Sequence, residues 1–307
     1  MASEMIELLW PSMGMDEWAA YEMRVNRTPL VRVDGVWWRR VRSLFFRPLN
    51  VHVAYPVGTR GPRLGMALGA VQFSVEQSDS ARSFIRMIVG HAPQAYSASA
   101  LPSNVQRDIR KGCRNHQIRW IQTADAMVEH GFHVYREFQQ RTHYQHLIER
   151  LDQNGFADWV KRVFEFRDIR VLGAYHEDSL SAVAITFRVG ETLHYSSYFG
   201  NAFSLGSCAS DCMLHTVRTA AAAPDSGVSR VHSAGAGMPR GLDNFYLRRG
   251  FKYFDQPALI RGNPLTLVVL RLMAPRAYRK LFGDNEDPGE TAAERVGAPI
   301  TPKVELK

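Results

Sequence analysis

The stretch from 169 to 200 most constrains the fold, because it holds three strand-like runs separated by two tight turns. The turns fall at Asp178 and at Gly190-Glu191, and the runs between them are IRVLGAYHE, SAVAITFRVG and TLHYSSYFG. β-Branched and aromatic residues favour strands, and connections this short join antiparallel neighbours. The sequence therefore predicts an antiparallel meander of three strands.

Helical and strand patterns flank this meander in a definite order. Ahead of it the sequence predicts a helix from 101 to 114, a strand over 118–121, and helices over 125–144 and 156–166. After it come a helix over 207–223, a strand over 228–235, a short helix over 241–250, and strands over 252–260 and 265–272. In the first hundred residues, Asp34-Gly35 predicts a hairpin, and SDSARSFIRMIVGH (78–91) predicts a helix with a serine or aspartate start and a glycine end.

Basic residues are concentrated in two stretches of a chain whose net charge is +8. Nine arginines lie between Arg24 and Arg63 against one acid, Asp34. The helix at 101–114 places Val105 and Ile109 on one face and its basic residues on the other. Such clusters favour an anionic partner: cofactor phosphates, a nucleic acid or a membrane face. A solvated basic surface is the simpler alternative, and no nucleic-acid-binding motif is present.

Cysteine count and hydropathy favour the cytoplasm. Three cysteines, Cys113, Cys208 and Cys212, predict no disulfide framework. Cys208, Cys212 and His215 share a helical face but match no standard zinc spacing, so we expect no metal site. The first residues lack a basic segment followed by an apolar one, as a secretory signal would have. The run at 64–75 is shorter than the roughly 20 residues that a bilayer span needs, so we expect no membrane span.

The stretch FYLRRGF, residues 245–251, resembles the YxxxGF ending of the GNAT acyltransferase superfamily. There a helix carrying a tyrosine ends at a glycine, since the chain reverses in left-handed backbone and the next phenylalanine returns to the core. The basic helix at 101–114 and strands like VLGAYHEDSLSAVAITF are similar to the Fem-like branch, which includes the aminoacyltransferases that build peptidoglycan bridges. The resemblance covers roughly 101–275. It implies a mixed, mostly antiparallel sheet flanked by helices, an α/β (α+β) fold.

The resemblance also implies candidate site residues. Tyr246 would be the acid that protonates the leaving group, and His194 and His232 would take a proton from the attacking amine. Each has a structural alternative as a packed side chain. The segment that would bind the pyrophosphate of acyl-CoA is Leu205, Gly206, Ser207, Cys208 and Ala209, although the glycine pattern and leading arginine of such loops are missing. Anionic donor or acceptor groups would contact Arg107, Arg110, Lys111 and Arg114.

The sequence thus predicts an N-acyltransferase that moves an acyl group from acyl-CoA to a small or peptidyl amine, with no tightly bound cofactor. Two alternatives stay open: a tRNA-dependent Fem-like aminoacyltransferase that binds RNA, and a GNAT-fold binding protein without catalysis. We expect an N-terminal α/β module at 1–100, as a reduced GNAT-like half, a GNAT-like domain at 101–283, and a disordered tail at 284–307.

Overall fold

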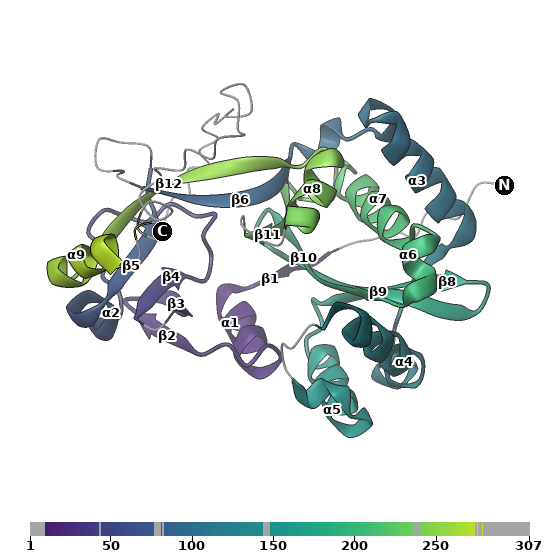
Figure 1. Ribbon diagram of the computed structural model, residues 1–307, viewed down its shortest axis with the longest axis horizontal. Coiled ribbons are helices and arrows are strands. Elements are labelled where there is room, and N and C mark those ends of the chain that lie inside the picture. Colours follow the sequence, from purple (N-terminus) through teal and green to yellow (C-terminus); the bar gives the residue numbers. More distant parts are fainter. Residues whose placement is uncertain are drawn as a thin grey trace. The chain divides into compact units, whose positions relative to one another are not determined.

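The computed structural model describes residues 10–42, 44–76, 81, 83–143, 148–235, 240–273, 275 and 278. The predicted tail at 284–307 lies outside these residues. Contacts divide the chain into two compact units, Met1–Val25 with Ile88–Lys252, and Asn26–Met87 with Tyr253–Lys307. These divisions differ from the predicted boundary at 100, and a separate N-terminal module remains a prediction. Figure 1 labels the helices and strands of both units.

The first unit is built on the predicted meander. Its strands follow the order β11-β10-β9-β8-β7, and a short strand, β1, runs parallel to β9. Neighbours from β7 to β10 are antiparallel, whereas β10 and β11 are parallel. The bounds are Ser12–Met13 (β1), Gln117–Trp120 (β7), Arg170–His176 (β8), Ser179–Val189 (β9), Thr192–Gly200 (β10) and Arg230–Gly235 (β11). At the β9–β10 turn, Gly190 has the left-handed φ of +56° that such a turn requires.

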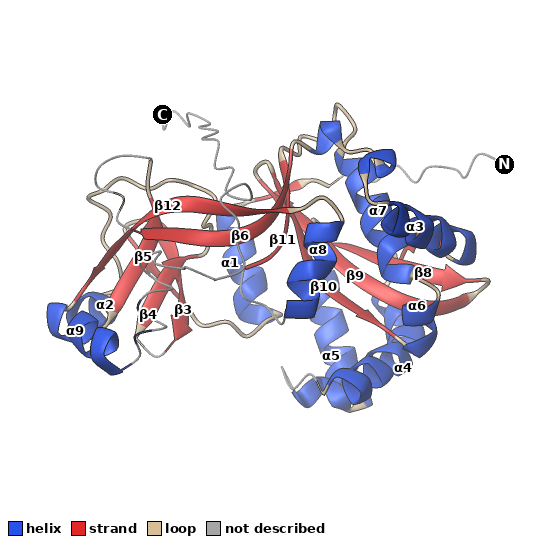
Figure 2. Ribbon diagram, turned by 45° about the horizontal axis from the view of Figure 1, so that its top comes forward, coloured by secondary structure: helices blue, strands red, loops and turns tan. Residues whose placement is uncertain are grey.

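Helices cover both faces of this sheet (Figures 1 and 2). On one face, α4 and α5 bring Tyr135, Phe156 and Trp159 against Phe199 of β10, with the Tyr135 and Phe199 ring centres 5.3 Å apart. On the other face lie α3 and α7, whose apolar sides are buried. The helices of this unit are α1 (Met15–Arg24), α3 (Ser103–Asn115), α4 (Ala124–Thr142), α5 (Gln153–Phe164), α6 (Ala202–Gly206), α7 (Ala209–Ala221) and α8 (Arg240–Arg248).

The second unit contains mixed-sheet strands in the order β2-β3-β4-β5-β12-β6. Trp38, Phe46, Val71, Phe73 and Val75 form its core. The predicted hairpin is confirmed: β2 and β3 are antiparallel, and positive φ at both turn residues matches a type I′ turn. The elements are β2 (Leu30–Val33), β3 (Val36–Arg42), β4 (Phe45–Pro48), α2 (Arg63–Leu68), β5 (Ala70–Ser74), β6 (Ser83–His91), β12 (Lys252–Gly262) and α9 (Pro264–Met273). The end of β6 from Ile88 and the first residue of β12 belong to the first unit.

Two predicted elements have the wrong type. Residues 83–91 form strand β6 and not a helix, since Ser83, Ile85 and Met87 alternate inward as in a strand. Residues 264–273 form helix α9 and not a strand, because the Asn263 side chain caps the backbone N–H of Leu265 at 2.8 Å. Among the described helices, every one is too short or too polar to pass through a bilayer.

Candidate active site

The strands β10 and β11 are paired over only part of their length. Among the described residues their parallel pairing covers three residue pairs and ends at His194–His232, although both strands continue beyond it. Just past that pair, β10 carries a bulge at Ser196, whose side chain is exposed. A bulge bends its strand and often lies beside an active site, since it redirects a side chain. The two strands therefore part directly after the histidine pair.

Two of the predicted catalytic residues meet where the strands part. The rings of His194 and His232 lie 5.4 Å apart. His194 is buried, stacked 4.9 Å from Phe187 and 4.8 Å from Trp18 of α1, so its ring is held in place by aromatic packing. His232 is less buried. Of the two imidazoles, His232 is the one that a substrate reaches with less rearrangement.

Tyr246, the third predicted catalytic residue, lies on α8 near the part of β10 that extends beyond its last pair with β11. Burial raises the pKa of its phenol to about 12, with the nearby phenol of Tyr198 adding to the shift. Burial also raises the pKa of Tyr195, and Tyr246 adds to that shift. Tyr246 is thus protonated at neutral pH and able to donate its proton to a developing anion.

The predicted glycine cap after Tyr246 is confirmed. Gly250 has a φ of +78°, and the N–H of Phe251 donates to the carbonyl of Tyr246 at 3.2 Å across the helix end. Phe251 is buried, with its ring 5.3 Å from that of Tyr246. The motif therefore fixes the position of α8 and of the phenol that it carries.

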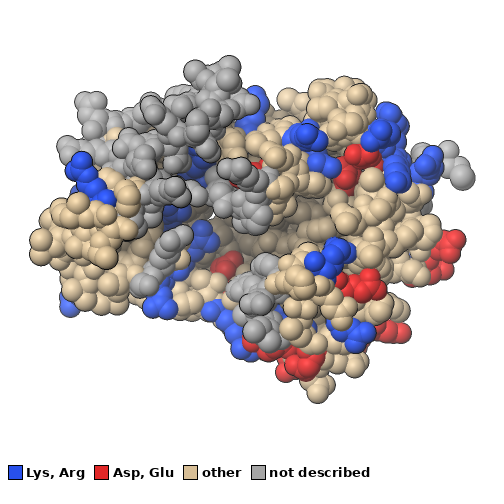
Figure 3. All heavy atoms as spheres, viewed as in Figure 1, with Lys and Arg blue, Asp and Glu red and all other residues tan. Residues whose placement is uncertain are grey.

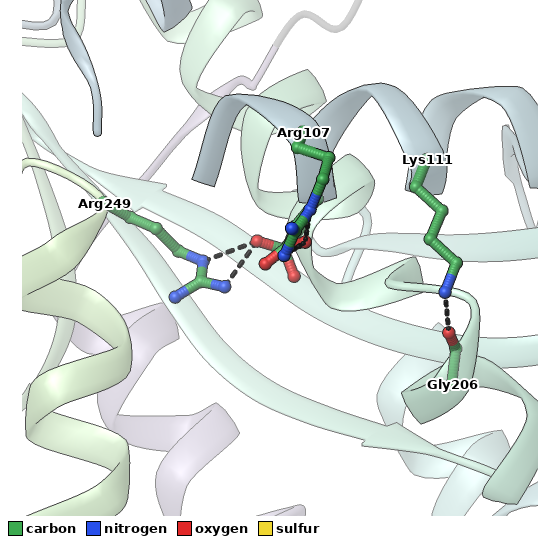
Figure 4. Close-up of polar contacts among 6 residues, drawn as sticks. Arg107, Lys111, Gly206 and Arg249 are labelled. Atoms are coloured by element: carbon green, nitrogen blue, oxygen red, sulfur yellow. Dashed lines mark hydrogen bonds and ion pairs between the residues drawn. The ribbon is translucent and has the colours of Figure 1, made fainter. Parts of the chain in front are cut away.

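The predicted basic helix and the predicted pyrophosphate segment lie together. The Lys111 Nζ donates to the carbonyl of Gly206 at 2.8 Å, which joins α3 to the end of α6 (Figure 4). Gly112 lets the helices approach, because a Cβ there would lie 2.3 Å from the Cys208 carbonyl oxygen. The other predicted basic residues, Arg107, Arg110 and Arg114, are exposed on α3.

The segment at 205–209 is not an extended glycine-rich loop. Leu205 and Gly206 end the short helix α6, Ser207 and Cys208 form a turn, and Ala209 begins α7. Cys208 adopts left-handed backbone with φ of 62° at the N-terminus of α7. Burial raises the pKa of its thiol, and nearby carboxylates add to that shift, so it is not an activated nucleophile.

A carboxylate occupies the first turn of α7, where a phosphate would meet the helix dipole. Asp211 is buried and paired with Arg249, whose Nε donates to it at 2.8 Å. Burial raises the pKa of Asp211, and the Arg249 guanidinium opposes the rise. Figure 4 shows Arg249 directed at the carboxylate that it pairs with, while Arg107 pairs with a different carboxylate, that of its neighbour Asp108, at 3.4 Å. Sequence patterns had not singled out the Asp211–Arg249 pair, because its residues are 38 positions apart.

A buried histidine network supports the same turn. The ring of His116 contacts the Ser207 Oγ at 2.7 Å and the Ser181 Oγ at 3.1 Å. Burial lowers the pKa of His116 to about 4, with His176 adding to the shift, so the ring is neutral at pH 7. This network joins the start of β7 to the α6–α7 turn and to β9. Sequence reasoning did not single out His116, because one histidine after a helix gives no signal.

The cysteine prediction is wrong. Cys113 of α3 and Cys212 of α7 form a disulfide, with their Cα atoms 5.0 Å apart. The two helices pack side by side, so residues 99 positions apart become neighbours, which a cysteine count does not foresee. Cys208 stays free, and the His215 Nδ1 lies 2.8 Å from the Tyr96 hydroxyl.

Comparison with known proteins yields structural matches alone. No family model matches this chain, and no curated protein matches its sequence. The C-terminal domain of a candidate lysylphosphatidylglycerol synthetase from Agrobacterium fabrum matches at 8% identity and TM-score 0.52, over 87% of this chain and 93% of that one. L-PGS from Bacillus licheniformis matches at 8% identity and TM-score 0.50, over 87% and 92%. FemX matches over 64% of this chain and 65% of that one, at 8% identity and TM-score 0.46.

These matches define the class of fold. The chain has a GNAT-like fold, with a mixed, mostly antiparallel sheet flanked by helices, and it is structurally similar to GNAT-fold proteins. The fold prediction is confirmed. At 8% identity the likeness concerns the fold and not the chemistry.

Proposed function

We propose that this chain is an acyltransferase that moves an acyl group from acyl-CoA to an amine by direct transfer. The observation that carries the proposal is the position of Tyr246: its phenol lies near those of Tyr195 and Tyr198 on β10, beyond the last β10–β11 pair. A proton donor and two imidazoles thus flank the place where the sheet parts. A thioester carbonyl inserted there would lie between them.

In the proposed reaction the ammonium form of the acceptor first loses a proton to His232, with His194 held behind it. The amine lone pair then forms a bond to the acyl carbon, and a tetrahedral intermediate results. As the carbon–sulfur bond breaks, the thiolate takes the proton of Tyr246. The tyrosinate takes the remaining extra proton from the nitrogen of the new amide, and His232 releases its proton to solvent, so both residues return to their starting states.

The donor test is a thermal-shift series on the full chain with CoA, acetyl-CoA and longer acyl-CoAs, with ATP as a phosphate control. A ligand at 100 times its dissociation constant adds about 2.7 kcal/mol of stability. We expect a shift with CoA species and none with ATP. Equal shifts with ATP, or none with any compound, would contradict an acyl-CoA donor.

The catalytic test is Tyr246→Phe, which removes one hydroxyl and keeps the ring contact with Phe251. We expect kcat for acyl transfer to fall by about 100-fold, the lower end of general acid contributions. Tyr135→Phe is the matched control, since Tyr135 is also a buried tyrosine but packs between α4, α5 and Phe199. Equal losses in the two variants would show that removing any buried hydroxyl lowers the rate, and would contradict a specific role for the Tyr246 proton.

One observation favours a second candidate, an aminoacyl-tRNA donor. Asp211 places a carboxylate at the start of α7, which disfavours a pyrophosphate there, while α3 exposes three arginines that suit RNA phosphates. RNA binding by the full chain, measured across salt, tests this candidate. Replacing Arg107, Arg110 and Arg114 by alanine should lower the slope of log affinity against log salt by roughly 2. An unchanged slope would exclude α3 as the contact.

A further inference from the structure

The net charge of the chain resides in the second unit. The residues of the first unit, 1–25 and 88–252, contain 20 Lys and Arg and 20 Asp and Glu. Those of the second, 26–87 and 253–307, contain 18 basic and 10 acidic residues, a net charge of +8. Up to residue 283 the excess is larger, with 15 basic and four acidic residues. The second unit therefore favours an anionic partner that the proposed acyl transfer does not require.

Helix α9 of this unit presents a continuous apolar stripe to solvent. Its members follow the spacing i, i+3, i+4, i+7, i+8 of one helix face, and they are Leu265, Val268, Val269, Leu272 and Met273. Leu265 and Leu272 are each 75% exposed, and Met273 is 83% exposed. Arg271 is the only charged residue in the helix. An exposed apolar stripe of this kind is typical of a surface that binds a membrane or another protein.

The helix is held firmly at its first turn, so the stripe is a fixed feature. The Asn263 side chain caps α9 and also donates to the carbonyl of Ala67 at 2.7 Å. The Thr266 hydroxyl donates to the carbonyl of Leu68 at 3.0 Å. Both acceptors lie at the end of α2, so α9 and α2 form one platform (Figures 1 and 2).

Helix α2 extends the apolar surface and adds positive charge. Leu64 is 50% exposed and Leu68 55% exposed. Beside them lies an open groove of about 540 Å³, whose charged lining residues are two arginines and one acid and whose other lining residues are apolar: Arg32, Arg63, Asp34, Val31, Val33, Phe46, Pro62 and Leu64. In Figure 3 the surface over α9 and α2 is mostly uncharged, and the charged side chains visible at its rim are basic.

We infer that the α2–α9 platform, defined as Leu64, Leu68 and the α9 stripe with Arg63 and Arg271, docks on an anionic phospholipid bilayer surface. The apolar side chains would enter the boundary between headgroups and acyl chains, while the arginines meet lipid phosphates. A second copy of the chain is disfavoured, because it would bring two strongly basic units together. RNA would use the charge but leave the apolar stripe in water.

The experiment is co-sedimentation of the full chain with vesicles of phosphatidylcholine alone and with 30% phosphatidylglycerol. We expect binding to the anionic vesicles and at least a ten-fold weaker partition to the neutral ones. Leu265→Glu combined with Leu272→Glu should lower partition by at least ten-fold, since two apolar anchors become charged. Arg63→Gln and Arg271→Gln should each lower it about five-fold, and less at high salt.

Matched controls lie in the first unit. Phe203 and Leu205 are exposed by 47% and 66%, and replacing both by glutamate adds the same charge elsewhere. This control variant should bind vesicles within two-fold to three-fold of the unmodified chain, and circular dichroism should show both variants folded. Equal losses in the two variants, or no binding to anionic vesicles, would overturn the inference. So would a concentration-dependent dimer that Leu272→Glu dissolves, or RNA binding with no vesicle binding.

Discussion

The Asp211–Arg249 pair offers the sharpest test of how the candidate site is held together. Asp211 is 5% exposed, and the Arg249 side chain is 12% exposed. Removing the carboxylate in Asp211→Ala leaves a guanidinium that water scarcely reaches. Breaking a buried ion pair in this way costs roughly 3–5 kcal/mol of unfolding free energy.

The expected loss lies at the lower end of that range. Arg249 keeps a hydrogen bond to the Phe245 carbonyl at 2.7 Å, and its guanidinium stacks 3.5 Å from the Phe245 ring centre. These contacts still satisfy part of the charge when the carboxylate is gone. We therefore expect Asp211→Ala to cost about 3 kcal/mol, and Asp211→Asn, which keeps an acceptor oxygen, about half as much.

The assay is urea unfolding at pH 7 of the unmodified chain, Asp211→Ala, Arg249→Met and the double variant. The double-mutant cycle should give a coupling free energy of at least about 1.5 kcal/mol. Asp225→Ala is the control, because Asp225 is an exposed acid near the other end of α7 and should change stability by less than about 0.5 kcal/mol. A loss below about 1 kcal/mol in Asp211→Ala, or a coupling near zero, would refute the reasoning.

Three further perturbations test the frame around the site. Gly250→Ala should lower the free energy of unfolding by about 1–2 kcal/mol in thermal unfolding, because the φ of Gly250 is +78°. Gly241→Ala is the control and should not destabilise the chain, since a Cβ at this helical position meets no other atom. Equal effects of the two substitutions would contradict the glycine cap. The Cys113–Cys212 disulfide joins residues 99 positions apart, so reducing it with dithiothreitol, or replacing Cys113 in Cys113→Ser, should lower the free energy of unfolding by about 2–4 kcal/mol. An unchanged urea midpoint would contradict this expectation. The pKa of His116 is about 6.5 in the unfolded chain and about 4 in the folded one. The free energy of unfolding therefore keeps its whole contribution from this residue above about pH 6.5, and it falls by up to about 3 kcal/mol as the pH drops toward 4. His116→Gln should flatten that part of the urea-midpoint profile, and an unaltered profile would argue against burial of a neutral ring.

Local patterns sufficed where one element carried its own signals. The meander, the basic helix α3 and the glycine cap at Gly250 follow from turn residues and periodicity that lie within a few positions of each other. Local patterns predicted the wrong type of element where contacts with the rest of the chain determine it. Strand β6 is buried on both faces from Met87 to Gly90, so the second half of its apolar run lacks the alternation of a strand with one exposed face. In α9, β-branched residues suggested a strand, although Asn263-Pro264 is a helix start.

The sequence predicted only those parts of the candidate site that lie in short, local patterns. His194, His232 and Tyr246 were named from a resemblance, and their roles remain predictions. The Asp211–Arg249 pair and the His116 network depend on contacts between residues 38 to 91 positions apart, for which a single sequence holds no signal.

The N-terminal segment has a consequence for the order in which the chain folds during synthesis. Trp10 is buried, its indole donates to the Thr186 hydroxyl at 2.9 Å, and its carbonyl accepts from Arg188. At about 5–20 residues per second, a ribosome needs roughly 10–35 s to make the intervening residues. During that time α1 and Trp10 lack the strand on which they pack. Residues 10–25 must therefore wait without their partner strand, and the second unit waits longer still, because β12, which pairs with β5, is made after β9.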